Sequence, residues 1–284
     1  ACFRLFTLQS FINLKESTVP EIERVNLSQI VLQLKFIGIE KIQDFNFLSP
    51  PSTSALSSAI QQLYLLGCLD KTGEITGHGR KVANLPLSPI FAHLVITSTK
   101  PDFSCTREIL SCVSCLSAEN VLFNPLDEGE REKAKVSHAQ FSSPEGDLPS
   151  LVRLFSMYMA ARKVHKGFGL NEWCRQKYLN AKSLEKALQI RTQLATIIKS
   201  KLKLDPNASC ESEGKKLLRC IAAGLSLQVA MRVPSVALND RKKQGIKRCY
   251  RVVRGGQEVV IHPTSSVFQR NPPPKCITYT EVLE

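Results

Sequence analysis

The chain has 284 residues, of which 43% are hydrophobic and 22% are charged. This is ordinary globular composition, and the length allows two or three small domains, each with its own core. No apolar stretch reaches the roughly 20 residues that span a bilayer, so we expect no membrane segment. The first residues, Ala1 to Thr7, have neither a basic lead nor a long apolar core, which argues against a signal peptide. Because there is no initiator Met, we expect a fragment.

Positive charge gathers toward the C-terminus of a chain whose net charge is +13. From Lys199 onward 16 Lys and Arg stand against 7 Asp and Glu, a surplus of 9, whereas the preceding residues hold 22 against 18, a surplus of 4. Such a distribution is expected of a surface that neutralises phosphates. The alternative is a solvated basic face without a ligand.

The ten cysteines are irregularly spaced. A chain of this length and core content does not need disulfides, so we expect reduced, mostly buried thiols. Cys112 and Cys115 form one C-x-x-C pair inside a predicted helix. A zinc site needs four ligands, and the nearest additional candidates, His93 and Cys105, follow no recognised spacing. We therefore expect packed core thiols and no metal site.

The first block of the chain, to about residue 89, predicts a winged-helix module. Asn26 is placed to cap a helix whose apolar residues recur at helical spacing over 27–34. A second helix is predicted from a serine-rich cap at 52–54 to Gly67, which can end it in a left-handed conformation. The segment 68–76 predicts a short hairpin.

The second block, about 90–210, predicts a bundle of helices. One helix is expected over 106–116, and a charged, exposed stretch follows at 127–135. Asp147 is placed to cap another helix, and Asn180 to cap the longest one, whose apolar residues form a single stripe.

The third block begins with a helix predicted over 217–232 and then changes character. Strands are predicted over 248–254, 258–261 and 276–279, with Gly255-Gly256 as the hairpin turn between the first two. Short strands joined by long basic loops predict a small Greek-key barrel.

The best nucleic-acid candidate is the basic run that leads into the first two predicted strands. Basic side chains, loop glycines and one tyrosine suit a single-strand binder, in which phosphates meet cations and a base stacks on a ring. Alternate strand residues face opposite ways, so they cannot all contact RNA. The alternative is a solvated loop. The candidate RNA-binding residues are Arg241, Lys242, Lys243, Lys247, Arg248, Tyr250, Arg251 and Arg254.

Arg191 is the other candidate, because it falls on the apolar stripe of the longest predicted helix. An unpaired buried charge is costly, so this arginine must be paired or must project across a domain boundary. We expect a salt bridge that joins domains, with direct RNA contact as the alternative. His262 is expected to be a turn residue, since a general base would need a visible partner. No catalytic residue is predicted.

Short strings at several places resemble the C-terminal half of the DEAH-box and RNA-helicase-A group of superfamily 2 helicases. They occur in the family's order and cover nearly the whole chain: CFRLFT at 2–7, PEI at 20–22, VLQLK at 31–35, FLSPP at 47–51, GCLD at 67–70, WC at 173–174, IRTQL at 190–194, QVA at 228–230 and IHPTS at 261–265. The chain departs from the family pattern at Leu148, where a His usually follows the Gly-Asp pair, and it stops at Glu284, before the last strands of the family's barrel.

The resemblance implies a mainly α fold with a small β part. Residues 1–18 would be the end of the second RecA-like motor domain or a linker, 19–89 a winged helix, 90–210 a ratchet-like helical bundle, and 211–284 an incomplete OB-like Greek-key barrel. The family's motor uses ATP and magnesium to pull RNA. This chain has neither a G-x-x-x-x-G-K-[ST] loop nor a DEAH string, so we expect no cofactor and no ATP hydrolysis by the chain alone.

We therefore expect the RNA-binding accessory region of an ATP-dependent RNA helicase. Its expected partners are single-stranded RNA and the helicase motor domains, and the resemblance favours a nuclear or nucleolar location, with the cytoplasm left open. Two alternatives remain. One is a module that docks protein activators or ribonucleoprotein components, and the other is a winged-helix regulator that binds DNA.

Overall fold

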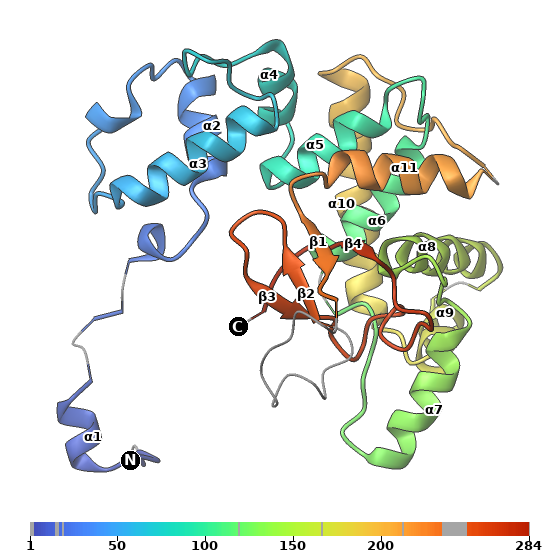
Figure 1. The fold of residues 1–284 in the computed structure, drawn as a ribbon. Coiled ribbons are helices and arrows are strands. Elements are labelled where there is room, and N and C mark those ends of the chain that lie inside the picture. Colours follow the sequence, from blue (N-terminus) through green and yellow to red (C-terminus); the bar gives the residue numbers. More distant parts are fainter. Residues whose placement is uncertain are drawn as a thin grey trace. The chain divides into compact units, whose positions relative to one another are not determined.

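The computed structural model describes residues 3–14, 17–18, 20–118, 120–165, 167–211, 213–234 and 249–283. It forms two compact units, Ala1–Arg80 and Lys81–Glu284 (Figure 1). Helix α4 (Gly77–Ala83) runs across the division between them. No helix in the part of the chain just defined is long and apolar enough to cross a membrane.

The first unit contains the predicted helix pair and hairpin. Its elements are α1 (Leu8–Ile12), η1 (Glu21–Glu23), α2 (Ser28–Phe36), η2 (Ile42–Asp44) and α3 (Thr53–Leu65). Helix α2 begins after Asn26, whose Oδ1 accepts a hydrogen bond from the Ser28 backbone at 2.8 Å. Helices α2 and α3 pack together through buried residues such as Val31 and Leu63. The prediction of these two helices is confirmed.

Two glycines shape the end of α3 and the hairpin. Gly67 ends the helix with φ +69°, and Gly73 turns the hairpin with φ +83°, both in the left-handed region that glycine adopts without strain. A bridge joins Leu69 to Ile75 across the hairpin. The Asp70 carboxylate closes the turn by accepting from the backbone N–H groups of Thr72 and Glu74, which lowers its pKa, the hydroxyl of Thr72 being the largest cause.

The second unit is a bundle of helices followed by a sheet. The helices are α5 (Pro89–Ser98), α6 (Thr106–Ala118), α7 (Glu128–Ala139), α8 (Asp147–Val164), α9 (Phe168–Gln176), α10 (Ala181–Ser200) and α11 (Gly214–Gly224). Helix α6 packs along both α10 and α8, and α11 packs on α5. At that last crossing a Cβ on Gly224 would lie 2.9 Å from the Leu94 Cα, so only glycine allows the approach.

The stretch 127–135, expected to be charged and exposed within the helical block, lies in helix α7, started by the Asp127 carboxylate, which accepts from the Glu130 backbone at 2.9 Å. Two other features of this bundle differ from the sequence-based expectations. Helix α11 ends at Gly224, so the helix expected over 217–232 was wrong in its second half. Asp147 does not cap α8, because Gly146 occupies the cap position. The Asn180 cap of α10 is confirmed by a 3.2 Å bond from the Ser183 backbone.

The sheet has four antiparallel strands among the residues that the structure describes. They are β1 (Val229–Arg232), β2 (Cys249–Val252), β3 (Glu258–Val260) and β4 (Cys276–Thr278), in the order β3-β2-β1-β4. Its inner face buries Ala230, Tyr250, Val252 and the nearby Ile261. Gly255 and Gly256, with φ +90° and +71°, make the predicted turn between β2 and β3.

Candidate nucleic-acid interface

Arg241, Lys242, Lys243, Lys247 and Arg248 fall outside the described residues, between the end of β1 and the start of β2. Both ends of this interval lie in neighbouring strands of one sheet, since Ala230 of β1 pairs with Val252 of β2. The prediction that these five side chains contact RNA therefore stays a prediction.

Tyr250 is a core residue, and the prediction that it offers a ring for stacking was wrong. Its side chain is 0% exposed, and its hydroxyl donates to the Pro274 carbonyl at 2.9 Å. Along β2 it shares the inner face with Val252, opposite Arg251. Side chains alternate between the two faces of a strand, and Tyr250 lies on the buried face rather than on the solvent-exposed one.

The described arginines around the sheet hold the fold together as well as carrying charge. Arg251 on the outer face pairs with Glu258 of β3 at 3.2 Å. Arg232 donates to the Pro273 carbonyl at 3.1 Å. Arg254, next to the turn, is half-buried and lies near Tyr279, whose pKa is raised by burial in spite of that charge. Arg251 and Arg254 are therefore at least partly accessible to solvent. Arg251 and Arg232 are held in place by Glu258 and by the Pro273 carbonyl.

A clamp that the sequence did not predict joins the loop after β3 to the start of α8. The Ser265 hydroxyl donates to one oxygen of the Asp147 carboxylate at 2.7 Å, and the Ser266 backbone N–H donates to the other at 2.7 Å. Arg270 adds a 3.1 Å bond to the Pro144 carbonyl. His262 is the turn residue expected, since its Nδ1 lies 2.7 Å from the Thr264 hydroxyl. Asp147 therefore links bundle and sheet.

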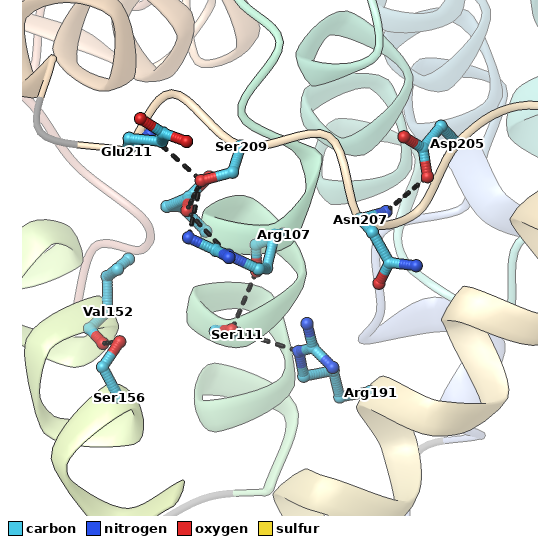
Figure 2. Close-up of polar contacts among 10 residues, drawn as sticks. Arg107, Ser111, Val152, Ser156, Arg191, Asp205, Asn207, Ser209 and Glu211 are labelled. Atoms are coloured by element: carbon cyan, nitrogen blue, oxygen red, sulfur yellow. Dashed lines mark hydrogen bonds and ion pairs between the residues drawn. The ribbon is translucent and has the colours of Figure 1, made fainter. Parts of the chain in front are cut away.

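Arg191 is held inside the bundle rather than across a domain boundary (Figure 2). Its Nε donates to the Ser111 hydroxyl on α6 at 3.1 Å, and its guanidinium lies 6.0 Å from the Phe155 ring centre. Burial is the main cause that lowers the Arg191 pKa, and the positive charge of Arg107 adds to it. Among the described residues it makes no ion pair, so the expected salt bridge was wrong.

Glu108, whose charge acts on Arg191, is bound by other groups. Glu108 is almost fully buried, and its Oε1 accepts from Arg107 at 3.1 Å and from the Ser209 hydroxyl at 2.7 Å. Arg107 also donates to the Ser209 hydroxyl at 2.6 Å, as Figure 2 shows. Oε1 is therefore bound by Arg107 and Ser209, while Oε2 is buried without a hydrogen-bond partner among the described residues.

The described cysteines are free, and all of them except Cys276 are buried. Burial raises the pKa of Cys115 to about 12, and it also raises that of Cys112. Within the described ranges no three His, Cys, Asp or Glu side chains are grouped so as to hold a metal. The C-x-x-C pair lies in the core of the bundle, on α6.

An open cavity of about 720 Å³ lies at the junction of the loop before α7, the end of α9 and the start of α10. Its lining includes Phe123, Arg175 and Lys182. The sequence pattern gave no signal for this site, because an aromatic between Leu122 and Asn124 looks like any loop residue until its exposure is known.

Charge divides sharply between the two units. Residues 1–80 hold seven Lys and Arg and seven Asp and Glu, so their net charge is zero. The whole surplus of 13 therefore belongs to residues 81–284. A winged helix that binds DNA needs cations for the phosphates, and this one has no net positive charge. The DNA-regulator alternative is not favoured by this distribution.

Models of three protein families match the chain in the predicted order. The winged-helix helicase associated domain (HA2) matches residues 59–87, the ratchet-like helicase associated domain (HA2) matches 88–151, and an oligonucleotide/oligosaccharide-binding (OB)-fold family matches 217–284. The predicted fold class and domain order are confirmed. The exact domain boundaries stay a prediction.

Known RNA helicases resemble the chain over its whole length. It is 33% identical over 284 residues to the probable ATP-dependent RNA helicase DHX35 of Homo sapiens, with 100% of the chain and 37% of the relative covered. It is 34% identical to the ATP-dependent RNA helicase DHX33 of Homo sapiens, with 99% and 37% covered. It is 33% identical to the pre-mRNA-splicing factor ATP-dependent RNA helicase DEAH10 of Arabidopsis thaliana, with 99% of the chain and 38% of the relative covered. The chain thus spans little more than a third of these relatives. Since the three domain families also match in order, the chain belongs to the C-terminal region of the DEAH-box RNA helicases.

Proposed function

We propose that this accessory region binds single-stranded RNA for an ATP-dependent helicase motor. The observation that carries the proposal is the charge distribution: the surplus of 13 lies entirely in residues 81–284, and it is densest in the part that matches an OB-fold family. OB-folds bind oligonucleotides through a basic groove that follows the backbone. Contacts to phosphates carry no sequence information, so preference among RNA sequences should be slight.

The chemistry of ATP hydrolysis would come from the motor. Phosphoryl transfer needs a phosphate-binding loop and carboxylates that hold magnesium, and this sequence has neither motif. The accessory region would hold the RNA while the motor moves it. We therefore expect no ATP turnover by the chain alone.

A salt series tests RNA binding by the basic run. If Lys242, Lys243, Lys247 and Arg248 each neutralise one phosphate, the slope of log affinity against log salt contains about −0.7 per contact. Replacing all four with Glu should flatten the slope by about 3 and weaken unrelated oligonucleotides about equally, as measured by fluorescence anisotropy.

A matched variant controls for net charge. Lys71, Lys100, Lys135 and Lys163 are exposed lysines elsewhere in the chain, and replacing these four with Glu changes the total charge by the same amount. This control should leave the slope nearly unchanged. Equal slopes in the two quadruple variants would contradict RNA contact by the basic run, and the protein-docking alternative would then be favoured.

A further inference from the structure

The cavity before α7 has no assigned ligand, and its walls include aromatic, cationic and amide side chains. Phe123 supplies an aromatic face, Arg175 and Lys182 supply cations, and Asn171 and Gln176 supply amides. Its volume of about 720 Å³ exceeds what one flat aromatic group needs, and it is open to solvent. The lining mixes apolar side chains such as Phe123 and Leu179 with these polar groups, so a ligand with a flat apolar face and a charged end would match it.

The Phe123 ring is presented to solvent by a rigid backbone. Leu122 bridges to Leu179, and the Phe123 backbone N–H donates to the Tyr178 carbonyl at 2.9 Å. The same carbonyl lies 2.9 Å from His138 Nε2 of α7. The ring is nevertheless 54% exposed, although its neighbour Leu179 is buried. Because the backbone is held and about half of the ring is exposed, a flat ligand can stack on the ring without displacing other parts of the protein.

Lys182 is the cation of the cavity that is available to a ligand. Among the residues that the structure describes it makes no ion pair, whereas Arg175 pairs with Glu172 at 2.8 Å. The carboxylate in the cavity wall, Glu130, is occupied by Lys133 at 2.7 Å and by the Tyr178 hydroxyl at 2.7 Å. The site therefore offers a ring face, one uncommitted positive charge and amide groups.

We propose that this cavity receives one unpaired nucleotide of the bound RNA, with its base stacked on Phe123 and its phosphate at Lys182. The proposal rests on the RNA binding proposed above and names a second contact, on the bundle. The burial of Tyr250 removes the stacking ring expected on β2, and Phe123 offers a ring elsewhere in the same unit. The exposed Lys186, one turn after Lys182 on α10, would meet the next phosphate.

Substitutions at Phe123 test the stacking directly. The 284-residue chain is titrated into single-stranded RNA that carries one 2-aminopurine, whose fluorescence falls when it stacks. Phe123→Ala should weaken binding about tenfold and abolish the fluorescence change, while Phe123→Tyr should keep both. Phe123→Leu should behave like the alanine variant, because bulk without a ring face does not stack a base. Lys182→Gln should flatten the salt slope by about 0.7.

Phe168→Ala is the matched control, since Phe168 is 85% exposed and does not line the cavity. It should bind RNA like the wild-type chain. Wild-type RNA affinity in Phe123→Ala overturns the inference, and so does wild-type RNA affinity in Phe123→Leu, which would mean that no base stacks on the ring. If the wild-type chain binds no RNA even at low salt, the proposed function itself fails. Equal melting temperatures of all variants ensure that folding does not cause the losses.

Discussion

Arg191 shows how one neighbouring residue changes the role of a buried charge. Its position on the apolar stripe is visible in the sequence, but its partner is not, because Arg107 occupies the Glu108 carboxylate from the adjacent position. Arg191 is left with a hydrogen bond to Ser111, whose own hydroxyl donates to the Arg107 carbonyl at 2.8 Å. Ser111 therefore keeps a partner if Arg191 is removed.

Arg191→Met should change the free energy of unfolding by less than about 1 kcal/mol. The reason is that methionine fills similar volume, while no carboxylate is left unpaired and no desolvated guanidinium remains. Thermal melts monitored by circular dichroism would measure this. A loss of about 3–5 kcal/mol would show that Arg191 does belong to a buried ion pair. An unchanged melt with weaker RNA binding would instead revive the contact alternative.

The thiols should differ strongly in reactivity. Burial raises the pKa of Cys68 and Cys115 to about 12 and that of Cys174 and Cys210 to about 11. A raised pKa keeps a thiol protonated, so raising the pH from 7 to 9 should increase the reaction rates of these four thiols very little. The exposed Cys276 should react rapidly. With Ellman's reagent, Cys276→Ser should remove one equivalent of fast-reacting thiol. Unfolding in urea should make the buried thiols react quickly as well. Fast reaction of the buried thiols without urea would contradict this assignment.

At the scale of elements, the sequence predicted what local signals determine. Helices α2, α3 and α10 were found because caps and apolar periodicity agree, and the β2–β3 turn because two glycines mark it. The bounds of α7 could not be predicted, because this charged, exposed helix carries no apolar stripe and only the Asp127 cap marks its start. The clamp at Asp147 could not be predicted, because it joins residues about 118 positions apart. Likewise, alternation along β2 shows that Tyr250 and Arg251 lie on opposite faces, but it does not show which face is buried. That depends on how the sheet packs, which the sequence pattern does not give.

The clamp makes Asp147 a stabilising link between α8 and the sheet. Asp147→Ala removes the acceptor of two hydrogen bonds and should cost about 1–2 kcal/mol. Hydrogen exchange should show faster opening of the 261–275 loop, while the core of α10 keeps its protection. Glu145→Ala, which removes a neighbouring exposed carboxylate, should change neither the free energy of unfolding nor the exchange rate of the 261–275 loop. Equal exchange in the two variants would mean that the clamp contributes nothing in solution.

At the scale of the whole molecule, the two units differ in charge, with zero net charge in residues 1–80 and 13 positive charges in residues 81–284. If phosphate contact follows this division, RNA affinity should depend on lysines of the second unit alone. In the first unit, Lys41 and Lys71 are exposed but accompanied by an equal number of acidic residues overall. In the second, exposed Lys182 and Lys186 lie on a helix face with no acidic residue between them except the ion-paired Glu185.

Charge reversal in pairs should therefore separate the units. Lys182→Glu with Lys186→Glu should flatten the salt slope by about 1.4, two contacts at about 0.7 each. Lys41→Glu with Lys71→Glu changes the net charge equally but should leave the slope nearly unchanged, because neither lysine is a proposed phosphate contact. Anisotropy across a salt series with a duplex DNA competitor measures both slopes and the preferred nucleic acid. If the first-unit pair changes the salt slope more than the second-unit pair, and duplex DNA competes strongly, the nucleic-acid contact lies on the winged helix. That result would favour a DNA-binding role.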